Sequence, residues 1–246
     1  MNMKSNKIRL SALFMAVVMC FANYSFACTN FLITKGASKD GSTMVTYAAD
    51  SHTLYGELYY NRAAQYPEGT MIQVIDWDSG KPLIKIPQVA NTYTTVGNMN
   101  QWGLAIAETT YGGREELVDT TGGIDYGSLI YLTLQRAKNA REAIKQIAEF
   151  VDTYGYYSSG ESFSIIDENE VWIMELIGKG APVYNKKGKI DKRWTKGAVW
   201  VAMRVPDGYI SGHANHARIT TFAQETKGSY KSISSKKIKE IKESML

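Results

Sequence analysis

The chain has 246 residues, of which 44% are hydrophobic, and a formal charge of +4 from 28 basic and 24 acidic side chains. Three basic and no acidic residues lie in the first 27 positions, so the remainder holds 25 basic against 24 acidic side chains. This balance excludes nucleic-acid binding driven by net charge, and the length suffices for one domain with a sizeable core.

Residues 1–27 have the pattern of a secretory signal, with a basic start, an apolar run over residues 10–22 and small residues at Ser25 and Ala27. The apolar run is too short to span a bilayer as a helix. We therefore expect cleavage after Ala27 and export to the periplasm or the extracellular space. The mature chain would begin at Cys28, with no transmembrane segment, and is expected to be soluble.

Cys28 is the candidate nucleophile. The second cysteine, Cys20, lies in the signal, so the mature chain would hold one thiol and no internal disulfide. An N-terminal cysteine places a thiol and an α-amine on one residue, and an amine with a pKa of about 8 is partly neutral at pH 7. The amine can take the thiol proton, and the thiolate can then attack an amide carbonyl to form an acyl-enzyme. This chemistry requires no metal and no cofactor.

Lipidation of Cys28, in a membrane-tethered binding protein, is the alternative. A lipoprotein signal places an aliphatic and then a small residue before the cysteine, where this chain has Ser25 and Phe26. A β-rich run, residues 29–34, follows Cys28 directly in place of a polar tether. Both features favour catalysis.

The first half of the chain is predicted to consist of strands. Residues 31–34 and 43–48 are expected to form a hairpin around a turn rich in Gly, Ser and Asp. Further strands are expected at residues 58–60, 71–77, 83–86, 92–96 and 104–109, with turns at 78–80 and 97–100.

Two helices are predicted in the middle of the chain. The first is expected over residues 128–138, and the second follows Asn139, which with Glu142 resembles a capping box. Apolar residues at helical spacing give the second helix one buried face, and Gly155 is expected to end it.

Strands are expected again at residues 162–166, 171–177 and 198–204. Strands, a helical pair and more strands predict an α+β fold, a layered sandwich with helices packed on a sheet. The domain is expected over residues 28–222, and residues 223–246 are expected to form a polar, Lys-rich, disordered tail.

Asp50 ends a strand that is expected to pair with the strand of Cys28. Its carboxylate can hold the ammonium or orient the thiol, although a turn role explains the spacing equally well. Asn100, Asn215 and Arg218 are further candidates for binding substrate, with turn or surface roles as the alternative.

The histidines leave two other chemistries open. A Cys-His hydrolase could use His52, His213 or His216. A His-x-x-His pair at residues 213 and 216 could bind a metal together with Asp50 or His52. Isolated histidines are more often hydrogen-bonding or surface residues, so neither pattern is specific.

Several short motifs extend from residue 28 to about residue 222. They include Ala-Cys-Thr-Asn-Phe-Leu-Ile at 27–33, Lys-Gly-Ala-Ser-Lys-Asp-Gly-Ser-Thr at 35–43, Ala-Asp-Ser at 49–51, Gly-Asn-Met-Asn at 97–100, Glu-Thr-Thr at 108–110 and Ala-Asn-His-Ala-Arg-Ile at 214–219. In this order they resemble the C69 family of dipeptidases. The resemblance implies an N-terminal nucleophile hydrolase with a four-layer αββα sandwich. It also implies metal-free, cysteine-type cleavage of small peptides, with Cys28 as the nucleophile.

The resemblance also extends to acylases of the bile-salt and penicillin V type, which are the alternative activity. Those enzymes pair the cysteine with an Asp, which falls on Asp50, and an Arg, which falls on Tyr47. Tyr47 cannot supply a fixed positive charge. Arg218 is a candidate replacement.

Members of the family are usually longer than this chain. The resemblance fades after residue 222, which implies a sandwich that is incomplete at the C-terminus and leaves an inactive fragment as a further alternative. Residues 186–196 are strongly basic and are expected to form an inserted surface loop. Oligomeric state is not encoded in these motifs.

Overall fold

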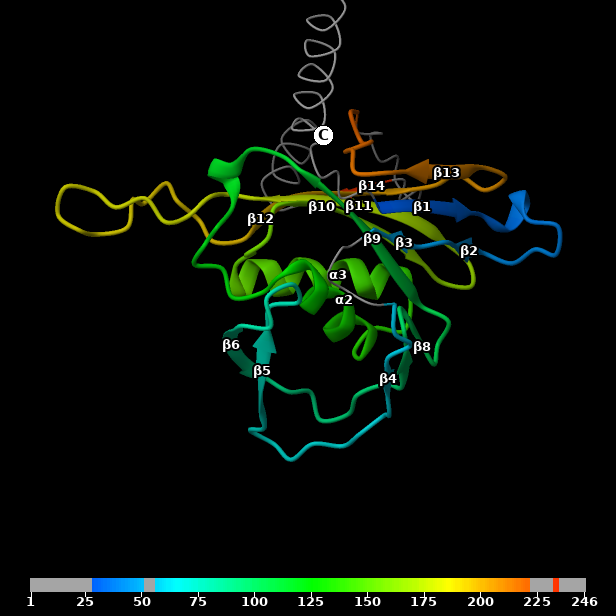
Figure 1. Ribbon diagram of the computed structural model, residues 1–246, viewed down its shortest axis with the longest axis horizontal. Helices are drawn as coiled ribbons and strands as arrows, with labels where there is room; N and C mark the ends of the chain where they lie inside the picture. Colours follow the sequence, from blue (N-terminus) through cyan, green and yellow to red (C-terminus); the bar gives the residue numbers. More distant parts are fainter. Residues whose placement is uncertain (1–27, 51–55, 222–231, 235–246) are drawn as a thin grey trace, which may run out of the picture.

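The computed structural model describes residues 28–50, 56–221 and 232–234, so the expected signal, His52 and most of the expected tail lie outside the described residues. In Figure 1 most of the long strands lie above the helices, and a separate strand pair lies below them. The α+β class and the layered sandwich of largely antiparallel strands agree with the expectation from sequence.

An eight-stranded antiparallel sheet, the large sheet, forms the centre of the fold, in the order β14-β12-β11-β10-β9-β8-β7-β4. In chain order its strands are β4 (Tyr60–Asn61), β7 (Thr95–Val96), β8 (Met99–Asn100), β9 (Ala105–Gly112), β10 (Gly160–Ile166), β11 (Val171–Gly178), β12 (Ala198–Arg204) and β14 (Ser232–Ser234). The predicted strands at 104–109, 162–166, 171–177 and 198–204 are confirmed. Within the expected tail, the structure describes only β14, which pairs with β12.

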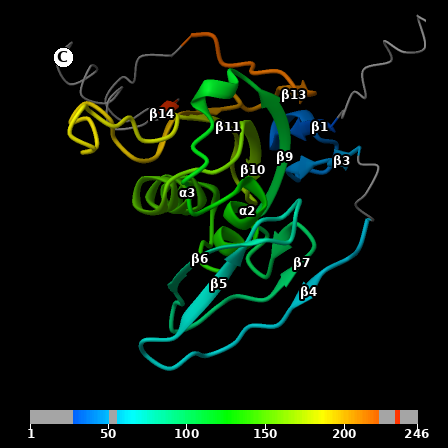
Figure 2. The same ribbon diagram turned by 60° about the vertical axis from the view of Figure 1, so that its left-hand side comes forward.

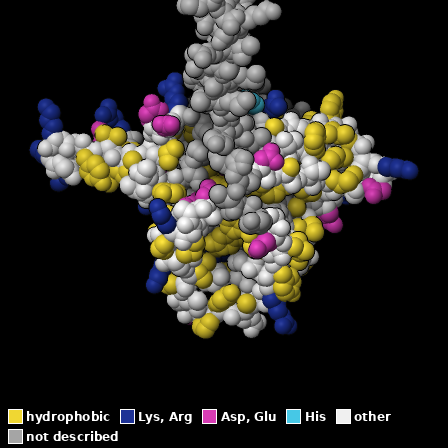
Figure 3. Space-filling view, viewed as in Figure 1, with side chains coloured by type: hydrophobic (Ala, Val, Ile, Leu, Met, Phe, Trp, Pro, Cys, Tyr) yellow, Lys and Arg dark blue, Asp and Glu magenta, His cyan; other side chains and the backbone are white. Residues whose placement is uncertain are grey.

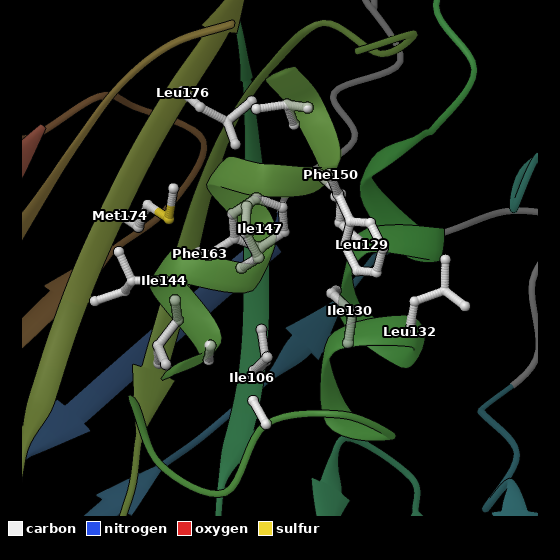
Figure 4. Close-up of a cluster of buried hydrophobic side chains, with 14 of the residues drawn as sticks. Ile106, Leu129, Ile130, Leu132, Ile144, Ile147, Phe150, Phe163, Met174 and Leu176 are labelled. Carbon is white, nitrogen blue, oxygen red and sulfur yellow. The ribbon is translucent and has the colours of Figure 1, made fainter. Parts of the chain in front are cut away.

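Two helices cover one face of the large sheet. The predicted second helix is confirmed as α3 (Ala140–Tyr154). It begins after Asn139 as predicted, because the Asn139 side chain accepts a hydrogen bond from the Glu142 backbone N–H at 2.9 Å. Its apolar residues Ile144, Ile147 and Phe150 are buried, and Figure 4 shows them toward side chains of the sheet such as Phe163 and Met174.

The first helix, α2 (Tyr126–Leu134), begins two residues earlier and ends four residues earlier than predicted. It begins early because the buried carboxylate of Asp125 caps it, accepting from the Gly127 N–H at 3.2 Å and the Trp77 N–H at 3.0 Å. Asp125 thereby joins α2 to the separate hairpin of β5 (Met71–Ile75) and β6 (Pro82–Pro87).

A small sheet lies on the other face of the large sheet (Figure 2). It contains β13 (Ile210–His213), β1 (Cys28–Ile33), β2 (Met44–Val45) and β3 (Ala48–Ala49), with the last three in the predicted hairpin region. Leu32 of the small sheet packs with Ala105 and Ile173 of the large sheet in a second apolar core.

The described residues therefore form three layers: helices, large sheet and small sheet. The outer face of the small sheet carries no helix within the described ranges. None of the described helices is both long enough and apolar enough to cross a membrane.

Candidate functional site

Cys28 lies at the start of β1, where the small sheet meets the edge of β9. Its backbone nitrogen donates a hydrogen bond to Asn215 Oδ1 at 2.5 Å. The Asn215 amide Nδ2 in turn donates to the Thr110 carbonyl oxygen of β9 at 2.7 Å. Asn215 thus connects the candidate nucleophile to the large sheet, and it does so with a left-handed backbone (φ 46°) that is uncommon for a residue other than glycine.

Asp50 also lies beside Cys28, because β3 pairs with the start of β1 and places Ala49 opposite Cys28. The backbone N–H of Asp50 donates to the Cys28 sulfur, while its carboxylate is a nearby negative charge. The structure therefore brings together three of the residues singled out from sequence: Cys28, Asp50 and Asn215.

The structure does not connect Asn100 or Arg218 to Cys28. The Asn100 amide is buried and donates to the carbonyl oxygens of Leu134 and Ala137, at 2.8 and 2.7 Å, so it ties a turn to the end of α2. The Arg218 backbone N–H donates to the carboxylate of Glu175 on β11. Its guanidinium acts as a nearby charge on His213.

Two buried acids that were not among the expected site residues belong to this region: Glu108, whose charge acts on the Cys28 thiol, and Glu161, which is bonded to Glu108. Glu108 on β9 and Glu161 on β10 are 3% and 0% exposed, and their carboxyl groups are hydrogen-bonded to each other. Burial raises the pKa of both, most strongly that of Glu161, which also faces the charge of Glu108. Both acids therefore hold their protons to higher pH than exposed carboxyl groups do.

Tyr47 completes this part of the site. Its hydroxyl donates to Glu108 Oε1 at 2.6 Å, and the Thr110 hydroxyl donates to Glu161 Oε2 at 2.9 Å. The hydroxyl of Tyr47, the residue that the resemblance aligns with the arginine of the bile-salt and penicillin V acylases, therefore binds a buried acid. The sequence did contain one indication of this buried acid, because Glu108 is a charged residue within a predicted strand that is otherwise largely apolar.

The thiol of Cys28 is harder to ionise than a free cysteine. Burial is the main cause of its raised pKa, and the charge of Glu108 adds to it. Hydrogen bonds from the Asp50 N–H and from Asn215 act in the opposite sense, because both stabilise the thiolate. A thiol in this setting needs a nearby base to react at neutral pH.

His213 is not placed to be that base. Its Nδ1 lies 3.0 Å from Thr109 Oγ1 and its Nε2 lies 2.8 Å from Ser164 Oγ, so both ring nitrogens are engaged. Burial, and then the charge of Arg218, lower its pKa to about 4. His216 is exposed. Among the described residues no three His, Cys, Asp or Glu side chains are grouped as a metal site.

A sequence profile of Peptidase family C69 matches residues 27–245, nearly all of the chain from Ala27 onward. The chain belongs to Peptidase family C69.

Curated relatives agree with this membership. The chain is 27% identical over 223 residues to probable dipeptidase A of Streptococcus pyogenes serotype M18, and 27% identical over 216 residues to dipeptidase A of Lactobacillus helveticus. It is 24% identical over 211 residues to a probable dipeptidase of Latilactobacillus sakei. These matches cover 80%, 79% and 78% of this chain but 41%, 41% and 40% of the relatives. The C69 chain described here thus spans about two fifths of their length.

Proposed function

We propose that this C69 chain is an exported cysteine dipeptidase in which Cys28, released as the N-terminal residue, is the nucleophile and its α-amine is the base. The single observation that carries the proposal is the 2.5 Å contact between the Cys28 nitrogen and Asn215 Oδ1. This contact fixes the nitrogen beside a thiol that needs a base. The names of the relatives support the choice of dipeptides as substrates.

The proposed reaction begins with transfer of the thiol proton to the Cys28 amine. The thiolate, held by the Asp50 N–H and by Asn215, attacks the peptide carbonyl carbon and forms a tetrahedral intermediate. The amine then gives the proton to the leaving amine as the C–N bond breaks. Water, activated by the same amine, releases the acyl group and restores the thiol.

The four-layer αββα sandwich is part of this proposal. The helix layer, large sheet and small sheet supply three layers in the required order, with Cys28 at the edge between the two sheets. A helix layer on the outer face of the small sheet would be the fourth.

The experiment is hydrolysis of alanyl-alanine by the exported protein and its variants. We expect Cys28→Ala to lose turnover by at least about three orders of magnitude, because the nucleophile and its acyl-enzyme are removed. EDTA should have no effect, because the proposed reaction uses no metal.

Undiminished activity of Cys28→Ala would overturn the proposal. A substrate panel separates it from the acylase alternative, because an acylase would prefer N-acyl amides such as penicillin V over dipeptides. Loss of activity with EDTA would indicate metal chemistry instead.

A further inference from the structure

A polar cluster that the proposed reaction does not use lies between the two sheets. Its members, here called the intersheet network, are Asn30 of β1, Thr109 of β9, Ser164 of β10 and His213 of β13. Their side chains are at most 2% exposed. Burying a polar group costs free energy unless the group is hydrogen-bonded. The hydrogen-bond partners of these four side chains therefore identify the strands that the network connects.

The hydrogen-bond partners of the network favour one tautomer of His213. Asn30 Nδ2 donates to Ser164 Oγ at 3.0 Å, and Ser164 Oγ lies 2.8 Å from His213 Nε2. We assign the Ser164 proton to this second contact, so that Nε2 accepts while Nδ1 carries the ring proton and donates to Thr109 Oγ1 at 3.0 Å. His213 is therefore a neutral imidazole, in agreement with its lowered pKa.

The network acts on the two strands that build the nucleophile site. Asn30 lies directly opposite His213 in the antiparallel pair of β1 and β13. Cys28 precedes Asn30 by two residues, and Asn215 follows His213 by two residues, so the same register places Cys28 against Asn215. Ser164 binds both members of the central pair and thus holds both strands to the large sheet.

The conformation of Asn215 has to be held in place by its neighbours. Its left-handed backbone is disfavoured for a residue with a side chain. Its side-chain amide also makes two hydrogen bonds at once, one to the Cys28 nitrogen and one to the Thr110 carbonyl oxygen. Asn215 follows β13 by two residues, because β13 ends at His213. The position of β13 therefore determines the position of Asn215.

We infer that His213, acting through Ser164, is a positioning residue that holds Asn215 against Cys28. This inference rests on the proposed role of Cys28 as the nucleophile. It concerns only the arrangement of the site, so it can be tested without turnover.

Ser162 provides a matched control on the same strand. It lies on β10 two residues from Ser164, on the same face, and is 0% exposed. Among the described residues its hydroxyl has no hydrogen-bond partner, although Ser162 lies opposite Thr109 in the pairing of β10 with β9. Ser162→Ala therefore removes a buried hydroxyl from this face without removing a hydrogen bond of the intersheet network.

The test is the rate of iodoacetamide reaction with Cys28 in the full chain, measured from pH 6 to pH 10 and resolved from Cys20 by peptide mass spectrometry. Asn215 stabilises the thiolate, so its displacement should raise the midpoint of the profile. Glu108 and Asp50, the charged groups that face Cys28, are the same in every variant. We expect Ser164→Ala, His213→Leu and Asn215→Ala each to move the midpoint upward by about half to one pH unit.

Two further variants make the result specific. The side chain of His213→Gln can still accept a hydrogen bond from Ser164, so this variant should have a midpoint close to that of the wild type. Ser162→Ala should also keep the wild-type midpoint. The inference is overturned if Ser164→Ala keeps the original midpoint, or if Ser162→Ala shifts it equally. It is also overturned if Asn215→Ala has no effect. Ser164→Ala removes a single oxygen, so it decides the question even if His213→Leu does not fold.

Discussion

At the scale of single residues, the site is defined by how burial shifts its pKa values. The Cys28 thiol and Glu161 both have raised pKa values because burial disfavours their charged forms, and the charge of Glu108 adds to both effects. His213 is the opposite case, since burial lowers its pKa to about 4 and keeps the ring neutral at neutral pH. Burial therefore favours the uncharged form of all three groups.

Glu161 predicts a specific dependence of stability on pH. Its pKa is raised in the folded state, so the folded chain holds a proton that the unfolded chain releases above about pH 4.3. Stability from this group is therefore present at low pH and is lost as pH rises, by up to about 1.4 kcal/mol per pH unit. Glu161→Gln, which does not titrate, should be more stable than the wild type at pH 8 and similar to it at pH 4.5.

Calorimetric melting temperatures of the two proteins at both pH values check this prediction. His213 acts in the opposite sense below about pH 6.5, so the difference between variants is the readout and not the slope of the wild type. Glu168→Gln, in the exposed turn between β10 and β11, is the control and should match the wild type throughout. An equal response of Glu161→Gln and wild type to pH would contradict the assignment.

At the scale of elements, the two helix caps differ in what they hold. Asn139 caps α3 at the surface, whereas Asp125 caps α2 in the interior and also accepts from the Trp77 N–H near the β5–β6 hairpin. Asn139→Ala should lower the free energy of unfolding by about 1 kcal/mol. Asp125→Ala should lower it by about 2–3 kcal/mol, because the buried Gly127 N–H and the partly buried Trp77 N–H both lose their acceptor.

Urea denaturation of both variants measures this difference. A cost for Asp125→Ala equal to or below that of Asn139→Ala would show that Asp125 is only a local cap. In that case the link between α2 and the hairpin would contribute little to stability.

Elements with strong local signals were the predictable ones. The capping pair of Asn139 and Glu142 and the apolar face of α3 are local patterns, and the structure confirms them. Strand β13 was missed because Ile-Ser-Gly-His has no β-like pattern, and its pairing with β1 comes from a distant part of the chain. The pairing of Glu108 with Glu161 depends on the register of β9 with β10, which no local pattern contains. The role of Cys28 stays a prediction, which rests on the local pattern of a signal-like segment before it.

At the scale of the whole molecule, the two faces of the sandwich are covered unequally. Helices bury one face of the large sheet, but the outer face of the small sheet presents Phe31, Met44 and Ile210, which are 51%, 42% and 60% exposed. These three residues lie on neighbouring strands and point to the same side. Figure 3 shows apolar side chains gathered at this end of the molecule. Contiguous apolar surface of this kind promotes self-association.

The double substitution Phe31→Thr and Ile210→Thr should therefore increase the monomer fraction in sedimentation velocity at a given concentration. Ile190→Thr is the control, because Ile190 is 46% exposed but lies in the basic loop of residues 186–196. Figure 1 shows this loop at the opposite end of the molecule from the small sheet. Equal monomer fractions in the double variant and the wild type would show that this face does not drive association.

The central claim is that Cys28, as the first residue of the exported chain, carries the acyl group during peptide hydrolysis. The most direct measurement is mass spectrometry of the enzyme quenched in acid during turnover of a dipeptide, with the N-terminal peptide resolved. We expect this peptide to begin at Cys28 and to carry the added mass of one aminoacyl group. A chain that begins elsewhere, a lipid-modified Cys28, or an acyl group on another residue would contradict it.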